Sequence, residues 1–167
     1  QLSIEITGAG AQRIPIAIVP FAGEGALAQG SSAGISAIVR ADLERSGLFR
    51  GLEVPPLSPP PTEASPVNYA EWKSRLADAV VLGSVAARPD GRFEVRFKLF
   101  DTVKGQDLSG VAYTLSREQL RTTAHRIADF VYEKLTGEKG VFSTRIAYVV
   151  KRGPKFELQI ADADGAG

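Results

Sequence analysis

Two strand-like segments near the end of the chain constrain the fold most, because a pair of strands needs further partners to be stable. A helical pattern ends at Gly137, and strand-like runs follow over Thr144–Val150 and Lys155–Ala161. A two-stranded hairpin on its own is only marginally stable in water. We therefore expect one complete domain followed by the opening strands of a truncated larger sheet, with a glycine-containing hairpin turn at Asp162–Gly165.

Several segments of the preceding sequence have the pattern of strands in a packed sheet. Ile14–Phe21 and Asp78–Ala87 are apolar along most of their length, which is typical of strands buried on both faces. Arg92–Asp101 alternates apolar and charged residues, so one of its faces should point to the core. Shorter strands are expected over Phe49–Val54 and Leu108–Leu115.

Two long helices should pack on this sheet. Apolar residues recur at helical spacing over about 33–46, where Ser31 or Ser32 can act as the N-cap. Ser116 is the expected cap of a second helix over about 117–136, which carries a continuous apolar stripe. The predicted fold class is therefore α/β, a two-layer mixed β-sheet with two main helices on one face, plus the truncated C-terminal hairpin.

The connection between the second and third strands of this sheet is unusual in composition. Half of residues 55–66 are proline, which predicts an extended surface loop that cannot pair in a sheet. A short helix is expected at Asn68–Leu76, with Tyr69 and Trp72 as core anchors on one face.

The composition argues against several classes of function. The net charge is +1 and no basic stripe is present, which disfavours binding to nucleic acid. The absence of cysteine excludes disulfides, thiol catalysis and cysteine-based metal sites. The sequence starts at Gln1 and has no methionine, so we expect a processed N-terminus or a cloning boundary, and in the first case an exported protein.

A glycine-rich loop is the strongest candidate for a small-ligand site. Gly23, Gly25 and Gly30 precede a helix, and helix N-termini bind anions. The third glycine is misplaced for a dinucleotide fingerprint, and no Lys-Ser/Thr pair follows to make a phosphate loop. Binding of a small ligand or nucleotide by residues 22–32 is therefore an alternative function rather than the preferred one.

The other candidate chemistry has simpler explanations. His125 is the only histidine, and it lies beside the apolar stripe of its helix, which predicts a half-exposed surface residue. Asp162 and Asp164 resemble the start of a calcium loop, but the acids that such a loop needs further on are missing. We expect no catalytic residue, no metal site and no cofactor.

The first residues form a pattern of their own. Leu2, Ile4 and Ile6 alternate with Ser3, Glu5 and Thr7, and small residues at positions 8–11 separate this run from the first buried strand. The alternation fits an ordinary edge strand of the sheet. It also fits a tethered strand that adds to the exposed sheet edge of another protein.

Taken together, these segments resemble the N-terminal domain of the TolB family, the periplasmic component of the Tol–Pal envelope system. The resemblance is carried by five segments in order: Ile14–Phe21, Ala41–Phe49, Tyr69–Val85, Phe100–Leu108 and Lys134–Val150. It implies an α/β domain, similar to anticodon-binding domains, followed by a six-bladed β-propeller. Residues 1–13 would be a flexible interaction arm, 14–140 the domain, and 141–167 a linker with the first propeller strands.

The resemblance also implies a non-enzymatic function in protein–protein interaction. In this family the extreme N-terminal segment binds the C-terminal domain of TolA, and the propeller binds the lipoprotein Pal. Neither nucleic acid nor direct membrane insertion is expected. By position, the residues that would contact TolA are Leu2, Ser3, Ile4, Glu5, Ile6 and Thr7.

Overall fold

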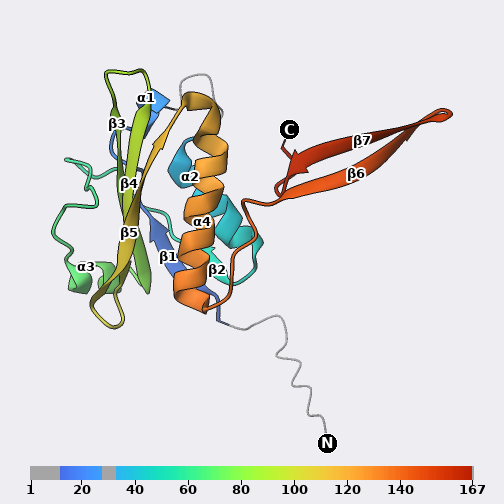
Figure 1. Cartoon of the computed structure of the whole chain (residues 1–167). Coiled ribbons are helices and arrows are strands. Elements are labelled where there is room, and N and C mark those ends of the chain that lie inside the picture. Colours follow the sequence, from blue (N-terminus) through green and yellow to red (C-terminus); the bar gives the residue numbers. More distant parts are fainter. Residues whose placement is uncertain (1–11, 28–32, 167) are drawn as a thin grey trace, which may run out of the picture.

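The computed structural model describes residues 12–27 and 33–166, which form a five-stranded sheet, its helices and a separate hairpin (Figure 1). The strand order in the sheet is β2-β1-β3-β4-β5. These strands are β1 (Ile14–Ile18), β2 (Phe49–Gly51), β3 (Ala79–Ala87), β4 (Phe93–Asp101) and β5 (Gln106–Leu115). The α/β prediction is confirmed. The predicted arm residues Leu2–Thr7 lie outside the described residues.

The sheet is mixed, as predicted. β1 pairs in parallel with both β2 and β3, while β3, β4 and β5 form an antiparallel meander. β1 and β3 are central and apolar on both faces, because each contributes alternate residues to cores on opposite sides of the sheet. The β4–β5 ladder shifts register between Leu99 and Phe100, and Phe100 packs on the opposite side of the sheet from Leu99.

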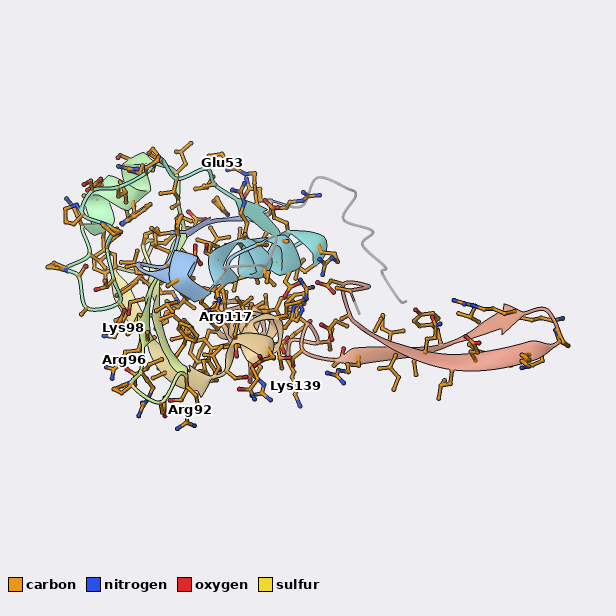
Figure 2. All side chains as sticks on the ribbon, turned by 90° about the horizontal axis from the view of Figure 1, so that it is seen from above. Glu53, Arg92, Arg96, Lys98, Arg117 and Lys139 are labelled. Atoms are coloured by element: carbon orange, nitrogen blue, oxygen red, sulfur yellow. The ribbon has the colours of Figure 1, made fainter. Side chains whose placement is uncertain are left out.

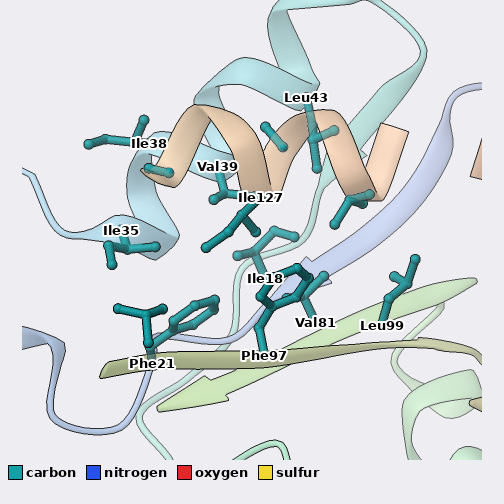
Figure 3. Close-up of a cluster of buried hydrophobic side chains, with 14 of the residues drawn as sticks. Ile18, Phe21, Ile35, Ile38, Val39, Leu43, Val81, Phe97, Leu99 and Ile127 are labelled. Carbon is teal, nitrogen blue, oxygen red and sulfur yellow. The ribbon is translucent and has the colours of Figure 1, made fainter. Parts of the chain in front are cut away.

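Two helices cover one face of the sheet (Figure 1). They are α2 (Ile35–Arg45) and α4 (Leu120–Thr136), and they pack against each other as well as on the strands. Figure 3 shows the centre of this core, where Val39 and Ile127 from the helices meet Ile18, Val81 and Phe97 from the sheet. All five side chains are at most 6% exposed.

The opposite face is covered by the proline-rich connection, which does more than loop over the surface. Together with α3 (Tyr69–Ser74) it places Leu52, Val54, Leu57, Val67 and the ring of Trp72 against a second apolar cluster on β1 and β3. Trp72 is buried and Tyr69 packs at the edge of the cluster, so the prediction that both are core anchors is confirmed.

The start of α2 corrects the prediction of a serine cap. The helix begins at Ile35 with Gly34 as N-cap, and no side chain of the N-cap residue bonds to it. Instead, Glu24 of the short helix α1 (Glu24–Leu27) accepts hydrogen bonds from the Ser36 backbone N–H and hydroxyl, at 3.0 and 2.6 Å. The Glu24 carboxylate therefore takes the place of an N-cap side chain at the start of α2.

The last helix begins and ends as the sequence predicts. Ser116 and Gln119 form a capping box around a single 3-10 turn, η1 (Arg117–Gln119), before α4 starts at Leu120. Gly137 ends α4 in the left-handed conformation (φ 77°) and donates its N–H to the Glu133 carbonyl, a common helix terminus for glycine. No helix in the described part of the chain is long and apolar enough to cross a membrane.

The hairpin projects away from the α/β body, by which we mean the region from β1 to α4 (Figure 1). It consists of β6 (Arg145–Arg152) and β7 (Lys155–Asp162), paired with each other in a two-stranded sheet. The predicted Asp162–Gly165 segment forms a turn after β7, in which Gly165 (φ 83°) donates its N–H to the Asp162 carbonyl and Asp162 donates to the Ala166 carbonyl. The turn that joins β6 to β7 lies instead at Gly153 (φ 62°), between the paired residues Arg152 and Lys155. We call residues Asp162–Gly165 the acidic turn.

Candidate functional site

The predicted arm leads into an internal strand of the sheet. Residues 12–13 are exposed and lead directly into β1, which has β2 on one side and β3 on the other. The six residues predicted to bind TolA, Leu2 to Thr7, precede the described part of the chain. Their role therefore stays a prediction.

The glycine-rich loop does not present an open helix N-terminus. The Glu24 carboxylate already accepts from Ser36 in the first turn of α2, which places a negative charge where a phosphate would bind. Residues 28–32 of this loop lie outside the described part of the chain. The contact of Glu24 disfavours the nucleotide-binding alternative.

The structure instead brings five charged or titratable residues together where the acidic turn meets the two helices. They are Asp42 of α2, Arg121 and His125 of α4, and Asp162 and Asp164 of the acidic turn, and we call them the junction cluster. The prediction that His125 is half-exposed is wrong, because its side chain is 2% exposed. It is buried because α2 packs over the same flank of α4 and supplies a polar partner there.

His125 and Asp42 form the inner part of the junction cluster. The two side chains are almost fully buried, and His125 Nδ1 lies 2.6 Å from Asp42 Oδ2. Since a carboxylate only accepts, Nδ1 carries the hydrogen of this bond. Arg45 Nη1 donates to the other Asp42 oxygen at 3.0 Å. Asp42 is thus paired on both sides, as a buried carboxylate must be.

The outer part of the junction cluster joins the acidic turn to α4. Arg121 donates through Nη2 to Asp164, and its Nε lies 3.8 Å from Asp162 Oδ2. His125 Nε2 faces the same two carboxylates, at 3.7 Å from Asp164 Oδ2 and 3.9 Å from Asp162 Oδ2. Arg145 of β6 approaches Asp162 from the solvent side, at 3.6 Å.

These contacts set the protonation of the cluster. The hydrogen bond to Asp42 is the main reason that the pKa of His125 is raised above 6.5, although burial opposes it and Asp164 adds to it. Burial alone would raise the pKa of Asp164, but the Ala166 N–H and the Arg121 guanidinium outweigh burial and lower it below 3.8. Near neutral pH, Asp164 is therefore ionised, and the surroundings of His125 favour its protonated form.

The carboxylates of the junction cluster are already paired with positively charged side chains of the same chain. Asp42, His125 and Asp164 offer atoms within 4.8 Å of one another, a spacing that could hold a metal ion. However, the Arg121 guanidinium already sits on Asp164, and the Asp42 oxygens are occupied by His125 and Arg45. A cation there would have to displace an arginine, so we assign no metal to this site.

A second anchor on α4 holds the other strand of the hairpin. Asp129 lies one turn after His125, and its carboxylate accepts the backbone N–H groups of Phe142 and Ser143 at 2.7 and 3.1 Å. Phe142 is buried in the main core, edge-on to Tyr132. Neighbouring turns of one helix thus fix the entry to β6 and the exit from β7.

The rest of the hairpin is exposed on both sides (Figure 2). Directly paired residues share a face of the ladder, so the pairs Val149–Leu158, Ala147–Ile160 and Lys151–Phe156 lie together. Leu158 and Phe156 are each 70% exposed. A contiguous exposed apolar face of this kind marks an interaction surface or an aggregation liability.

We expect this chain to self-associate through that face. Replacing Val149 and Leu158 with threonine keeps the β-propensity of both strands while removing apolar surface. The double variant should show a weaker dependence of sedimentation coefficient on protein concentration than the parent chain. Tyr148→Thr, on the other face, is the matched control. Equal concentration dependence in the parent chain and the double variant would contradict the expectation.

Comparison with known proteins identifies the family. The family model described as the TolB amino-terminal domain matches residues 2–108. The chain belongs to the TolB family. The resemblance inferred from the sequence is thereby confirmed, and membership supports a role in the Tol–Pal system of the cell envelope.

Curated relatives and a solved TolB structure agree with this assignment. The chain is 59% identical to the Tol-Pal system protein TolB of Dechloromonas aromatica and 56% identical to that of Aromatoleum aromaticum, over 99% of its length. A crystal structure of TolB from Acinetobacter baumannii superposes on 92% of the chain with a TM-score of 0.74 and 35% identity. The chain covers 37% of each of these three proteins, so it spans little more than a third of their length.

The junction cluster was only partly visible in the sequence of this TolB-family chain. Asp42 occupies a position in the apolar stripe of α2, and a carboxylate at such a position needs a partner. His125 was the obvious candidate by residue type, but 83 residues separate the two. Only the packing of α2 on α4 brings them together.

Proposed function

We propose that this chain is a non-enzymatic, periplasmic interaction domain of the Tol–Pal system that binds TolA through residues 1–13. Residues 14–140 would form the rigid domain that carries this arm. Residues 141–167 would lead into a β-propeller, through which the whole protein would bind Pal. Membership of the TolB family, whose members are named as Tol–Pal system proteins, is the observation that carries the proposal.

The sequence of the arm supports binding by strand addition. Leu2, Ile4 and Ile6 alternate with polar residues, so main-chain hydrogen bonds would give affinity while the three apolar side chains fill alternate pockets on the partner. The arm joins the body at β1, a central strand of the sheet.

Titration with the C-terminal domain of TolA tests the proposal. The intact chain should bind, and a chain lacking residues 1–12 should lose binding because the recognised strand is gone. Isothermal titration calorimetry gives both the affinity and the enthalpy of strand addition. Circular dichroism of the shortened chain establishes that the body is still folded.

Point variants distinguish the contribution of the apolar side chains to TolA binding from that of the arm as a whole. Replacing Leu2, Ile4 and Ile6 with serine should weaken binding at least tenfold, because about 1.5–3 kcal/mol is associated with each buried side chain of this size. Replacing Ser3 and Thr7 with alanine is the matched control and should leave affinity nearly unchanged. Equal binding by the intact and shortened chains would refute the arm as the TolA site.

A further inference from the structure

The junction cluster contains two buried side-chain nitrogen atoms that lack a hydrogen-bond partner among the described residues. They are Arg121 Nε and His125 Nε2. Both face the carboxylates of the acidic turn, at 3.7 to 3.9 Å, which is just beyond hydrogen-bond distance. Buried polar atoms without partners are rare in native proteins and call for an explanation. A shift of the turn by about 1 Å toward α4 would satisfy both.

We propose that α2 and α4 form a proton-regulated docking site for the acidic turn, in which protonation of His125 draws Asp162 and Asp164 onto α4. The docking site lies on the body, and the segment that it binds is the Asp-x-Asp sequence of the acidic turn in the same chain. The proton on His125 regulates this binding. The site would control how the hairpin is positioned on the body (Figure 1). The inference does not depend on binding of TolA.

The direction of the effect follows from the fixed tautomer. Because Asp42 holds the hydrogen on Nδ1, neutral His125 presents a bare lone pair at Nε2 to two carboxylates, which can only accept. Protonation turns Nε2 into a charged donor aimed at the same carboxylates. Charge-assisted hydrogen bonds are about twice as strong as neutral ones. Asp42 stays bonded in both states and is the main cause of the raised pKa of His125, but only protonation gives the acidic turn a donor at Nε2.

The surrounding charges leave His125 as the titrating member near neutral pH. Arg45 faces it through Asp42 on α2, Arg121 lies one turn earlier on α4, and Arg145 of β6 reaches Asp162 from outside. Arginine stays protonated at any pH that a folded protein survives. The guanidinium groups therefore attract the carboxylates of the acidic turn equally at every pH, and the imidazolium of His125 adds to this attraction when it forms.

The pH window follows from the two shifted groups. The pKa of His125 is raised in the folded state, so its contribution is complete below pH 6.5 and is lost as the pH rises through the raised value. The pKa of Asp164 is lowered, so its contribution is present above pH 3.8 and is lost only as the pH falls through the lowered value. Docking should be tightest between these limits and weaken on the alkaline side.

Because His125 is the only histidine, its NMR titration reports the site directly. The pKa measured for the parent chain should fall in the Asp162→Asn/Asp164→Asn variant, since the carboxylates that favour the imidazolium are gone. Each unit of decrease corresponds to about tenfold stronger docking by the protonated form. Asp107→Asn, which breaks the exposed pair with Lys98 on the sheet, is the matched control and should leave the pKa of His125 unchanged.

A distance measurement tests whether the proton moves the hairpin. The chain has no cysteine, so spin labels at Glu133→Cys on α4 and Lys155→Cys near the hairpin tip are unambiguous. In the parent chain, the distribution of distances between the two labels should be narrower below pH 6.5 than about two pH units above it. The Asp162→Asn/Asp164→Asn variant should abolish this change, although it leaves the His125–Asp42 pair in place. His125→Gln should abolish it too. A distribution that does not respond to pH in the parent chain, or responds equally in the aspartate variant, would overturn the proposal.

Discussion

Replacement of Asp42 by alanine is expected to lower the free energy of unfolding by about 3–5 kcal/mol, one of the two largest effects of a single substitution that we predict. The carboxylate is 1% exposed and is the partner of both His125 and Arg45. Its removal leaves the buried imidazole with no acceptor at Nδ1, in addition to the unsatisfied Nε2. Urea unfolding followed by the fluorescence of the single tryptophan, Trp72, measures the loss.

The pH dependence of this loss is a sharper test than its size. Since the hydrogen bond to Asp42 is the main cause of the raised pKa of His125, the stability that it provides is complete below pH 6.5 and decreases as the pH rises through the raised value. The Asp42→Ala variant should therefore be most impaired at about pH 6 and less impaired at about pH 8.5. A loss that is constant across this range would show that Asp42 does not raise the pKa of His125.

Replacement of Phe97 by alanine is also expected to cost about 3–5 kcal/mol. Phe97 is 1% exposed beneath the two helices, and its ring meets Phe130 edge-on at 5.2 Å and Tyr113 in a stack at 6.4 Å. The truncation creates a cavity between the sheet and α4, and the cost of such a cavity adds to the lost burial of the ring. The shift in urea midpoint, at unchanged slope, measures the effect.

Phe156→Ala is the matched control, because it makes the same change on the exposed hairpin. Phe156 is 70% exposed, with Lys151 Nζ over its ring at 5.7 Å, so the expected change is within about 0.5–1 kcal/mol. Similar losses at Phe97 and Phe156 would contradict the expectation that burial of the ring determines the loss.

The fold was predictable from the sequence wherever the secondary structure and burial of a segment follow from its own residues. The alternation in Arg92–Asp101 correctly placed Phe93, Val95, Phe97 and Leu99 in the core. Ser116 and Gly137 correctly marked the ends of the last helical segment. The start of α2 was mispredicted because its cap comes from Glu24, a residue outside the helix whose position depends on the preceding turn.

The junction cluster shows that the spacing of apolar residues in a helix does not predict the burial of every side chain. A stripe analysis assigns apolar residues to the core and polar residues to solvent, so His125 was placed at the surface. Its burial depends on a charged partner on another helix and on a turn at the end of the hairpin. Such a pairing is a property of tertiary packing, and a single sequence contains no local signal for it.

The two anchors on α4 make the hairpin a lever. Asp129 fixes the entry to β6 through Phe142 and Ser143, while the acidic turn holds the exit from β7 one helical turn away. Paired strands lie about 4.8 Å apart, and the eight residues of β6 extend roughly 27 Å from this base. A displacement of the acidic turn about the fixed Asp129 contact is therefore multiplied about fivefold at the tip. The proposed shift of about 1 Å in the acidic turn would therefore move the far end of the hairpin by about 5 Å.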